Sequence, residues 1–287
     1  MHIAFKFKYT HDNGLFTRLL NRISERSALP LSLYHEGSEY RVEASGEQAA
    51  LEALAEEVSV LVPRSLFLGE YAIEEVTEEK AQGSELLTQD HTFYQIPYCP
   101  ECQQKVIETF DPFCECDVCG FSDTSLGMED LATYTGVNAE SNKTFFDQLA
   151  NQLFEKGEIS LPTYNGIRRF SLLSSGGDTN EGILFCDAAD ISEKFLITQG
   201  ELDALMTVEK PTVRLKAKFK FRMEHALDEP FYPVFFADDK ITLALSNALK
   251  EKGVEAVFCD KVTTLRVASA LEQQLMVSVG RDVLPWH

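Results

Sequence analysis

Two Cys-x-x-Cys pairs lie close together in the first half of the sequence. Cys99 and Cys102 form the first pair, Cys116 and Cys119 form the second, and thirteen residues separate the two pairs. One such turn presents two thiolates to a cation, and two facing turns complete the tetrahedral set of thiolates that is typical of structural zinc sites. The spacing therefore predicts a zinc ion held by these four cysteines. Because four thiolates leave no open position for a substrate, we expect the site to be structural.

Two neighbouring residues offer alternatives to this ligand set. Cys114 lies two residues before Cys116, so the sequence Cys-Glu-Cys-x-x-Cys offers Cys114 as a replacement for Cys116. The odd spacing of Cys114 favours Cys116. His91 could also approach the metal, but an exposed histidine without a ligand role is the simpler interpretation.

Cysteine usage and hydropathy indicate a cytoplasmic protein. Five of the seven cysteines fall between Cys99 and Cys119, which argues for metal binding rather than a disulfide framework, and for a reducing compartment. Cys186 and Cys259 lie in apolar runs without a basic neighbour, so we expect buried, unreactive thiols. The N-terminal sequence alternates polar and apolar residues, unlike a signal peptide, and no apolar run approaches the length of a membrane span.

The formal net charge of −20 limits the classes of partner. Surfaces that bind the phosphates of nucleic acids need positive potential, so we expect no nucleic-acid binding despite the zinc motif. An acidic surface either serves solubility alone or docks a basic partner protein.

Apolar periodicity predicts an α+β protein with three regions. Residues 1–90 form the first, a ferredoxin-like domain of order β-α-β-β-α-β followed by an acidic linker over 77–90. Its expected elements are strands at 2–9, 31–37, 39–45 and 66–76 and helices at 15–28 and 47–62. The zinc module is expected over 91–135, and a mixed α/β domain over 136–287.

The most regular strand predicted in the third region covers 211–221. Its apolar residues alternate with the basic residues Arg214, Lys216, Lys218, Lys220 and Arg222. Such a strand spaces basic side chains in a line, which suits an anion or an acidic peptide; the simpler interpretation is a solvated face balanced by local acids. Arg168 and Arg169 are candidates to extend this basic stripe.

The chain resembles the N-terminal half of the HypF family, carbamoyltransferases that mature nickel–iron hydrogenases. The resemblance rests on YCPECQQKVIETFDPFCECDVCG, on LANQLFEKGEISLPTYNGIRRFSLLSSGG with GILFCDA, and on ELDALMTVEKPTVRL. The zinc module and LMTVEKPTVRL are its most specific parts. It implies an acylphosphatase-like first domain, one family zinc module and a YrdC-like nucleotide-binding third domain.

Departures from the family pattern favour binding over catalysis. The arginine of the acylphosphatase phosphate loop is displaced to Arg18 on the predicted helix, and Tyr164 stands near the position of a YrdC-like lysine. The second zinc module and the transferase domain of the family are absent from the sequence, and it holds no P-loop, G-x-G-x-x-G, G-x-S-x-G or H-E-x-x-H motif. We assign no catalytic residue.

The sequence therefore favours a zinc-containing accessory protein for nickel–iron hydrogenase maturation or assembly. Its partner would be a hydrogenase subunit or another maturation protein. The alternative is an enzyme that handles carbamoyl phosphate or ATP and forms an acyl-adenylate, as the resemblance to HypF and YrdC implies.

Overall fold

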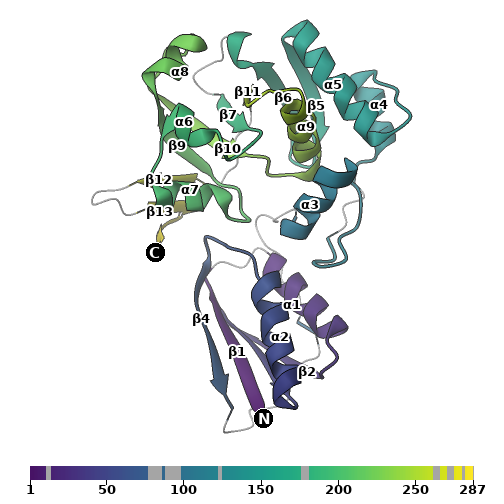
Figure 1. The fold of residues 1–287 in the computed structure, drawn as a ribbon, viewed down its shortest axis with the longest axis vertical. Helices are drawn as coiled ribbons and strands as arrows, with labels where there is room; N and C mark the ends of the chain where they lie inside the picture. Colours follow the sequence, from purple (N-terminus) through teal and green to yellow (C-terminus); the bar gives the residue numbers. More distant parts are fainter. Residues whose placement is uncertain are drawn as a thin grey trace. The chain divides into compact units, whose positions relative to one another are not determined.

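The chain forms two compact units, each with its own sheet (Figure 1). The computed structural model describes residues 1–10, 14–76, 86–87, 98–121, 125–175, 181–260, 266–269, 275–279 and 282–286. The first unit comprises Met1–Glu101 and Glu115–Phe121, and the second comprises Cys102–Cys114 and Ser122–His287. Helices and strands mix in both units, so the predicted α+β class is confirmed. The domain boundaries predicted at residues 90 and 135 stay predictions, and most of the predicted linker lies outside the described residues.

The first unit has the predicted order β-α-β-β-α-β. Its strands form one sheet in the order β2-β3-β1-β4, with every neighbouring pair antiparallel, and Figure 1 shows both helices on one side of it. The elements are β1 His2–Tyr9, α1 Leu15–Arg26, β2 Leu31–Glu36, β3 Glu39–Ser45, α2 Gln48–Leu61 and β4 Leu68–Glu75.

Aromatic packing holds the helices of this unit to the sheet. Phe5, Phe7 and Tyr9 alternate along β1 and are buried. The ring of Phe16, on α1, stacks on Tyr9 at a centroid distance of 4.9 Å and meets Tyr40 edge-on at 5.1 Å. Such pairs add to the stabilisation from apolar burial, so the alternation in β1 and the helical period in α1 supply one shared core.

The second unit is built on a ten-stranded mixed sheet in the order β14-β13-β12-β9-β10-β7-β11-β6-β5, with β8 paired to β9. Helix α5 ends at Gly157, whose φ of 78° suits glycine, and packs against α9. The elements are α3 Pro100–Thr109, α4 Met128–Thr135, α5 Asn142–Lys156, β5 Glu158–Thr163, β6 Gly166–Leu172, a short 3-10 helix Leu173–Ser175, β7 Gly182–Phe185, α6 Ile191–Lys194, β8 Phe195–Leu196, α7 Gln199–Met206, β9 Thr212–Ala217, α8 Phe219–Glu224, β10 Phe231–Phe236, α9 Lys240–Glu251, β11 Ala256–Cys259, β12 Arg266–Ser269, β13 Leu275–Val279 and β14 Asp282–Trp286.

The strand predicted over 211–221 is wrong in its second half. Strand β9 ends at Ala217, and the chain turns into helix α8 at Phe219. Phe221 is buried at 2% exposure while Phe219 is 75% exposed, so the two rings do not share a face as a strand requires. The residues of 219–224 also suit a helix, in which Phe221 contacts His225 one turn later.

None of the helices in the described parts of the chain is both long and apolar enough to cross a membrane.

Candidate metal centre

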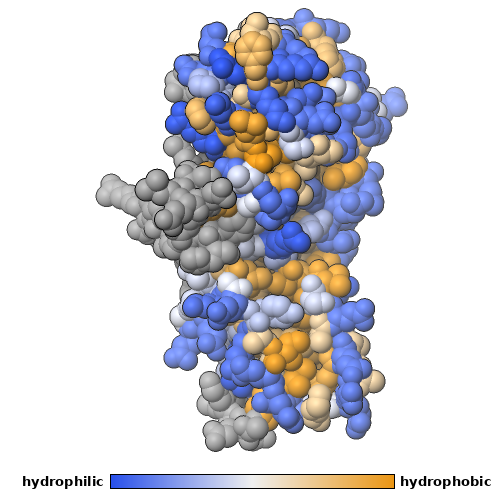
Figure 2. Space-filling view, turned by 60° about the vertical axis from the view of Figure 1, so that its left-hand side comes forward, coloured by the Kyte–Doolittle hydropathy of each residue, from blue (hydrophilic) through white to orange (hydrophobic). Residues whose placement is uncertain are grey.

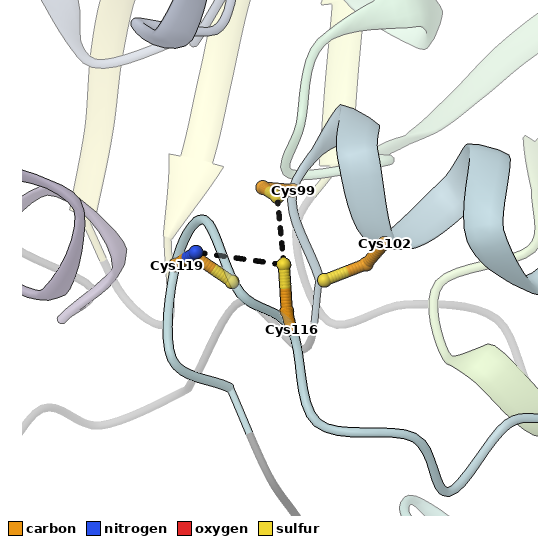
Figure 3. A group of neighbouring side chains, drawn as sticks. All are labelled: Cys99, Cys102, Cys116 and Cys119. Atoms are coloured by element: carbon orange, nitrogen blue, oxygen red, sulfur yellow. Dashed lines mark hydrogen bonds between the residues drawn. The ribbon is translucent and has the colours of Figure 1, made fainter. Parts of the chain in front are cut away.

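The four cysteines of the two Cys-x-x-Cys pairs lie together with their sulfur atoms facing one another (Figure 3). All four side chains are buried, and their Sγ atoms lie within 4.8 Å of one another. Sγ of Cys99 is 3.7 Å from Sγ of Cys116. Cys99, Cys102, Cys116 and Cys119 thus form a compact group of four thiols, in the combination that the spacing predicts.

Different local structures present the two pairs. Cys99 directly precedes α3 and Cys102 lies in its first turn, where Pro100 suits the start of a helix. The positive end of the helix dipole favours thiolates at this position. Cys116 and Cys119 lie on a tight turn, in which the backbone N–H of Cys119 donates to Sγ of Cys116 at 3.5 Å.

A single tetrahedral cation fits this group. Four sulfurs that each lie about 2.3 Å from a zinc ion are about 3.8 Å from one another, close to the distance between Cys99 and Cys116. A buried cluster of thiolates would repel without a cation, so the donor set suits a thiophilic metal. The geometry supports metal binding, and zinc is the metal that we propose below.

Cys114 stands outside the group. Its half-buried thiol donates to the backbone oxygen of Asp111 at 3.2 Å, whereas Cys116 is buried among the other three ligands. The structure therefore favours Cys116 over Cys114. His91, the other alternative, lies outside the described residues.

Three arginines of α1 support the turn that carries Cys116 and Cys119, within the first unit. Arg22 donates to Glu115 at 3.1 Å, and Arg26 donates to the backbone oxygen of Asp117 at 3.2 Å. The guanidinium of Arg18 lies over the ring of Phe121 at 5.5 Å. A metal with four thiolates carries a net negative charge, so nearby guanidinium groups favour the site.

The spacing of these three arginines in the sequence indicates that they lie on one side of α1. Arg18, Arg22 and Arg26 recur every four residues and therefore share one face of the helix. This period predicts a shared face but not its partner, because the loop that Arg22 contacts lies more than ninety residues away in the sequence.

Side chains of the second unit hold the segment between the two cysteine pairs. Nδ2 of Asn247 donates to the backbone oxygen of Ile107 at 3.0 Å, and Nζ of Lys240 donates to that of Cys114 at 2.7 Å. Lys240 is fully buried, so this hydrogen bond gives its amine a partner in place of water. Both side chains belong to α9, which thus positions the segment.

The structure separates the predicted basic stripe. Arg214 and Lys216 lie exposed on one face of β9, while Lys218 caps α8 and Lys220 pairs with Glu224 on that helix. The exposed face also holds Phe231, whose ring lies 5.6 Å from the guanidinium of Arg214.

Arg168 and Arg169 are neighbours on β6, but the side chain of Arg168 is buried and that of Arg169 is exposed. Arg168 is 2% exposed, and both of its terminal nitrogens donate to the carboxylate of Asp238. Burial alone would lower the pKa of Arg168, but the hydrogen bond and charge of Asp238, together with Asp239, outweigh burial and raise it. Arg169 is exposed and pairs with Glu181. Only Arg169 of the two presents its guanidinium to solvent.

The remaining thiols have surroundings that disfavour reactivity. Burial raises the pKa of Cys186 to about 12, so its thiol stays protonated near neutral pH. Cys259 is fully buried in β11.

Comparison with known proteins relates this chain to solved HypF structures. No family model and no curated protein matches it. Among solved structures, HypF of T. kodakarensis matches with a TM-score of 0.58 and 10% identity over 99% of this chain and 54% of that one. A full-length HypF in a phosphate- and nucleotide-bound form matches with a TM-score of 0.46 and 13% identity over 100% of this chain and 55% of that one.

The chain has a HypF-like fold. It spans about half the length of the two HypF chains.

Proposed function

We propose that the chain is a zinc-containing accessory protein for nickel–iron hydrogenase maturation or assembly, and that it acts by binding another protein. The observation that carries this proposal is the buried group of four thiols within a HypF-like fold. Zinc is the proposed metal because two Cys-x-x-Cys pairs with a tetrahedral set of sulfurs are typical of structural zinc sites. The partner would be a hydrogenase subunit or another maturation protein in the cytoplasm.

Finer features of the fold support this assignment. The first unit, with strand order β2-β3-β1-β4 and two helices, is a candidate acylphosphatase-like domain, and the second is a candidate YrdC-like domain. Fold alone does not imply activity, so these domains are proposed as scaffolds rather than as catalysts.

Binding is favoured over catalysis by the arrangement of the charged and nucleophilic groups. Arg18, the displaced phosphate-loop arginine, lies over Phe121, and Arg168 is committed to Asp238. The thiol of Cys259 is fully buried, and desolvation raises the pKa of the half-buried Cys186 thiol. Residues 11–13 of the corresponding loop lie outside the described part of the chain.

Arg214 and Lys216 are the proposed contacts to the partner. Both are exposed on β9, beside the 44% exposed ring of Phe231. Basic side chains next to an exposed aromatic ring suit an acidic segment of a protein, because the ring adds apolar contact to the charge attraction.

Co-purification tests the proposal. The tagged chain would be expressed with a nickel–iron hydrogenase and its maturation proteins, and we expect a hydrogenase subunit or a maturation protein to be retained. Arg214→Glu with Lys216→Glu should lose that partner, whereas Lys252→Glu, at an exposed lysine elsewhere in the same unit, should keep it. Retention of no hydrogenase component by the wild-type protein would contradict the proposal.

Calorimetric titration with ATP and with carbamoyl phosphate separates this function from the enzymatic alternative. We expect no saturable binding of either compound. Micromolar binding that is lost on Arg169→Ala or Lys216→Ala would favour the enzyme. Titration with RNA tests the expectation that nucleic acid is not a ligand, since binding through phosphates would weaken steeply with salt.

A further inference from the structure

An apolar groove lies between α2 and β4 in the first unit, away from the cysteine residues. Its volume is about 180 Å³. Its lining is mostly apolar and includes Phe5 and Phe7 of β1, Val58 of α2, Tyr71 and Ile73 of β4, and Val62 and Arg64 of the segment that follows α2. The net charge of the protein is −20, and an apolar recess on the surface of such a protein indicates a binding site.

Tyr71 and Ile73 lie on the helix-covered face of the sheet and yet remain exposed. In the register of β1 and β4, Phe7 lies opposite Tyr71 and Phe5 lies opposite Ile73, so each pair shares a face. Phe5 and Phe7 are buried, whereas Tyr71 is 62% exposed and Ile73 is 49% exposed. Figure 2 shows an apolar strip on the surface of this unit, bordered by hydrophilic residues.

Strand β4 is also an edge strand. It lies at the end of the order β2-β3-β1-β4, and no described strand pairs with its outer side. Outward N–H and C=O groups of an edge strand are a template for an added strand, which is how many proteins bind extended peptides. An extended segment could therefore pair with β4 and place alternate side chains over the groove.

Charge on β4 decides which segment fits. Glu70, Glu74 and Glu75 are exposed on this strand. Antiparallel pairing of two copies about Ala72 would place Glu70 of each copy opposite Glu74 of the other, and like charges at such positions are destabilising. A second copy of this chain is thus disfavoured, and a basic partner is favoured. Because Lys6 already pairs with Glu74, Glu70 and Glu75 provide most of the attraction.

We propose that the edge of β4 binds an extended segment of a partner protein that carries two apolar residues and flanking lysines or arginines. In antiparallel register, apolar residues lie opposite Ile73 and Tyr71 and cover the groove. Basic residues lie opposite Glu75, Glu74 and Glu70. The corresponding six-residue pattern is basic, basic, apolar, any, apolar, basic. This surface does not depend on the metal, on the basic face of β9 or on the proposed role in hydrogenase maturation.

Peptide binding tests the proposal directly. The probe is a labelled peptide KKVTVK, titrated into the full chain by fluorescence anisotropy, with NMR amide shifts to locate it. The equally charged peptide KKPTPK is the control for unspecific attraction, since its prolines lack the N–H groups that a strand needs. We expect KKVTVK to bind at least about tenfold more tightly than KKPTPK and to shift amides of β4.

Variants at exposed positions give a second test. Ile73→Asp should weaken binding of KKVTVK about tenfold or more through lost apolar contact, and Glu70→Lys should weaken it about fivefold. Glu36→Lys, an exposed acid at the other edge of the same sheet, should leave it unchanged. The charge-swapped peptide EEVTVE should bind the Glu70→Lys variant better than the wild-type protein.

Three results would overturn the proposal. The first is equal binding of KKVTVK and KKPTPK, or none at all. The second is a set of amide shifts on β2 instead of β4. The third is a dimer in sedimentation that Ile73→Asp dissociates, because a second copy would then occupy the groove.

Discussion

Cys114 and Cys116 differ in what surrounds their sulfur atoms. Cys116 lies among three other buried thiols, and Cys114 donates to a backbone oxygen outside that group. We therefore predict that the Cys116→Ser variant loses its zinc, while the Cys114→Ser variant keeps one zinc ion per chain, as measured by elemental analysis of the purified proteins. Retention of zinc by Cys116→Ser together with loss in Cys114→Ser would assign the ligand to Cys114.

Removal of Arg168 should cost the second unit a large part of its stability. Its guanidinium lies beside the carboxylates of Asp238 and Asp239, and removing one partner of a buried ion pair leaves uncompensated charge. The Arg168→Met variant should lose about 3–5 kcal/mol of unfolding free energy at pH 7 in denaturant titrations. Arg169→Met, at the exposed neighbouring position, should change little.

The loss at Arg168 should also depend on pH. Burial raises the pKa of Asp239 above its usual 3.8, while the charge of Arg168 opposes this rise. A raised pKa in the folded state means that the fold binds the proton more tightly, so the stability contributed by Asp239 falls as pH rises above 3.8. In the Arg168→Met variant, the stability contributed by Asp239 falls further, because no guanidinium charge opposes the rise of its pKa. The difference between wild type and Arg168→Met should therefore be smaller at pH 5 than at pH 7; a difference that grows on acidification would contradict the account.

At the scale of elements, helix α8 is the feature that sequence periodicity failed to predict. A strand over 211–221 would place Phe219 and Phe221 on the same face, with similar losses on truncation. The helix buries Phe221 and exposes Phe219. We predict that Phe221→Ala lowers the unfolding free energy by about 3 kcal/mol or more and that Phe219→Ala changes it by less than about 0.5 kcal/mol. Equal losses of unfolding free energy in the two variants, measured by thermal or denaturant unfolding, would favour a strand over this segment instead of α8.

Other elements could be predicted because their apolar residues repeat over several turns or alternations. Leu15, Leu19 and Ile23 mark α1, and the glycine after Lys156 marks the end of α5. The segment at 219–224 is short, so its apolar and basic residues fit both the period of a strand and the period of a helix. A tertiary contact selects the helix, because Phe221 packs against Phe195 of β8.

At the scale of the whole molecule, the sequence predicted the ligands better than their surroundings. The Cys-x-x-Cys spacing identified the group of thiols because all four residues lie within a short stretch. The ion pair of Arg168 with Asp238 joins residues seventy positions apart, and no local pattern carries that information. For the same reason Arg168 was expected with the exposed basic residues, although it is buried.

Metal removal should affect folding of the molecule, because the proposed cation would link the two segments that carry the four thiols. We predict that a strong chelator lowers the midpoint of thermal unfolding and that added zinc restores it. An unchanged midpoint after verified loss of the metal would show that the group of thiols does not stabilise the fold.

X-ray absorption at the zinc edge of the purified protein tests whether the four cysteines hold one zinc ion. We predict one zinc ion per chain with four sulfur neighbours at about 2.3 Å and no nitrogen or oxygen neighbour at bonding distance. A protein purified without zinc, or a spectrum that requires nitrogen or oxygen ligands in place of any of the four sulfurs, would contradict it.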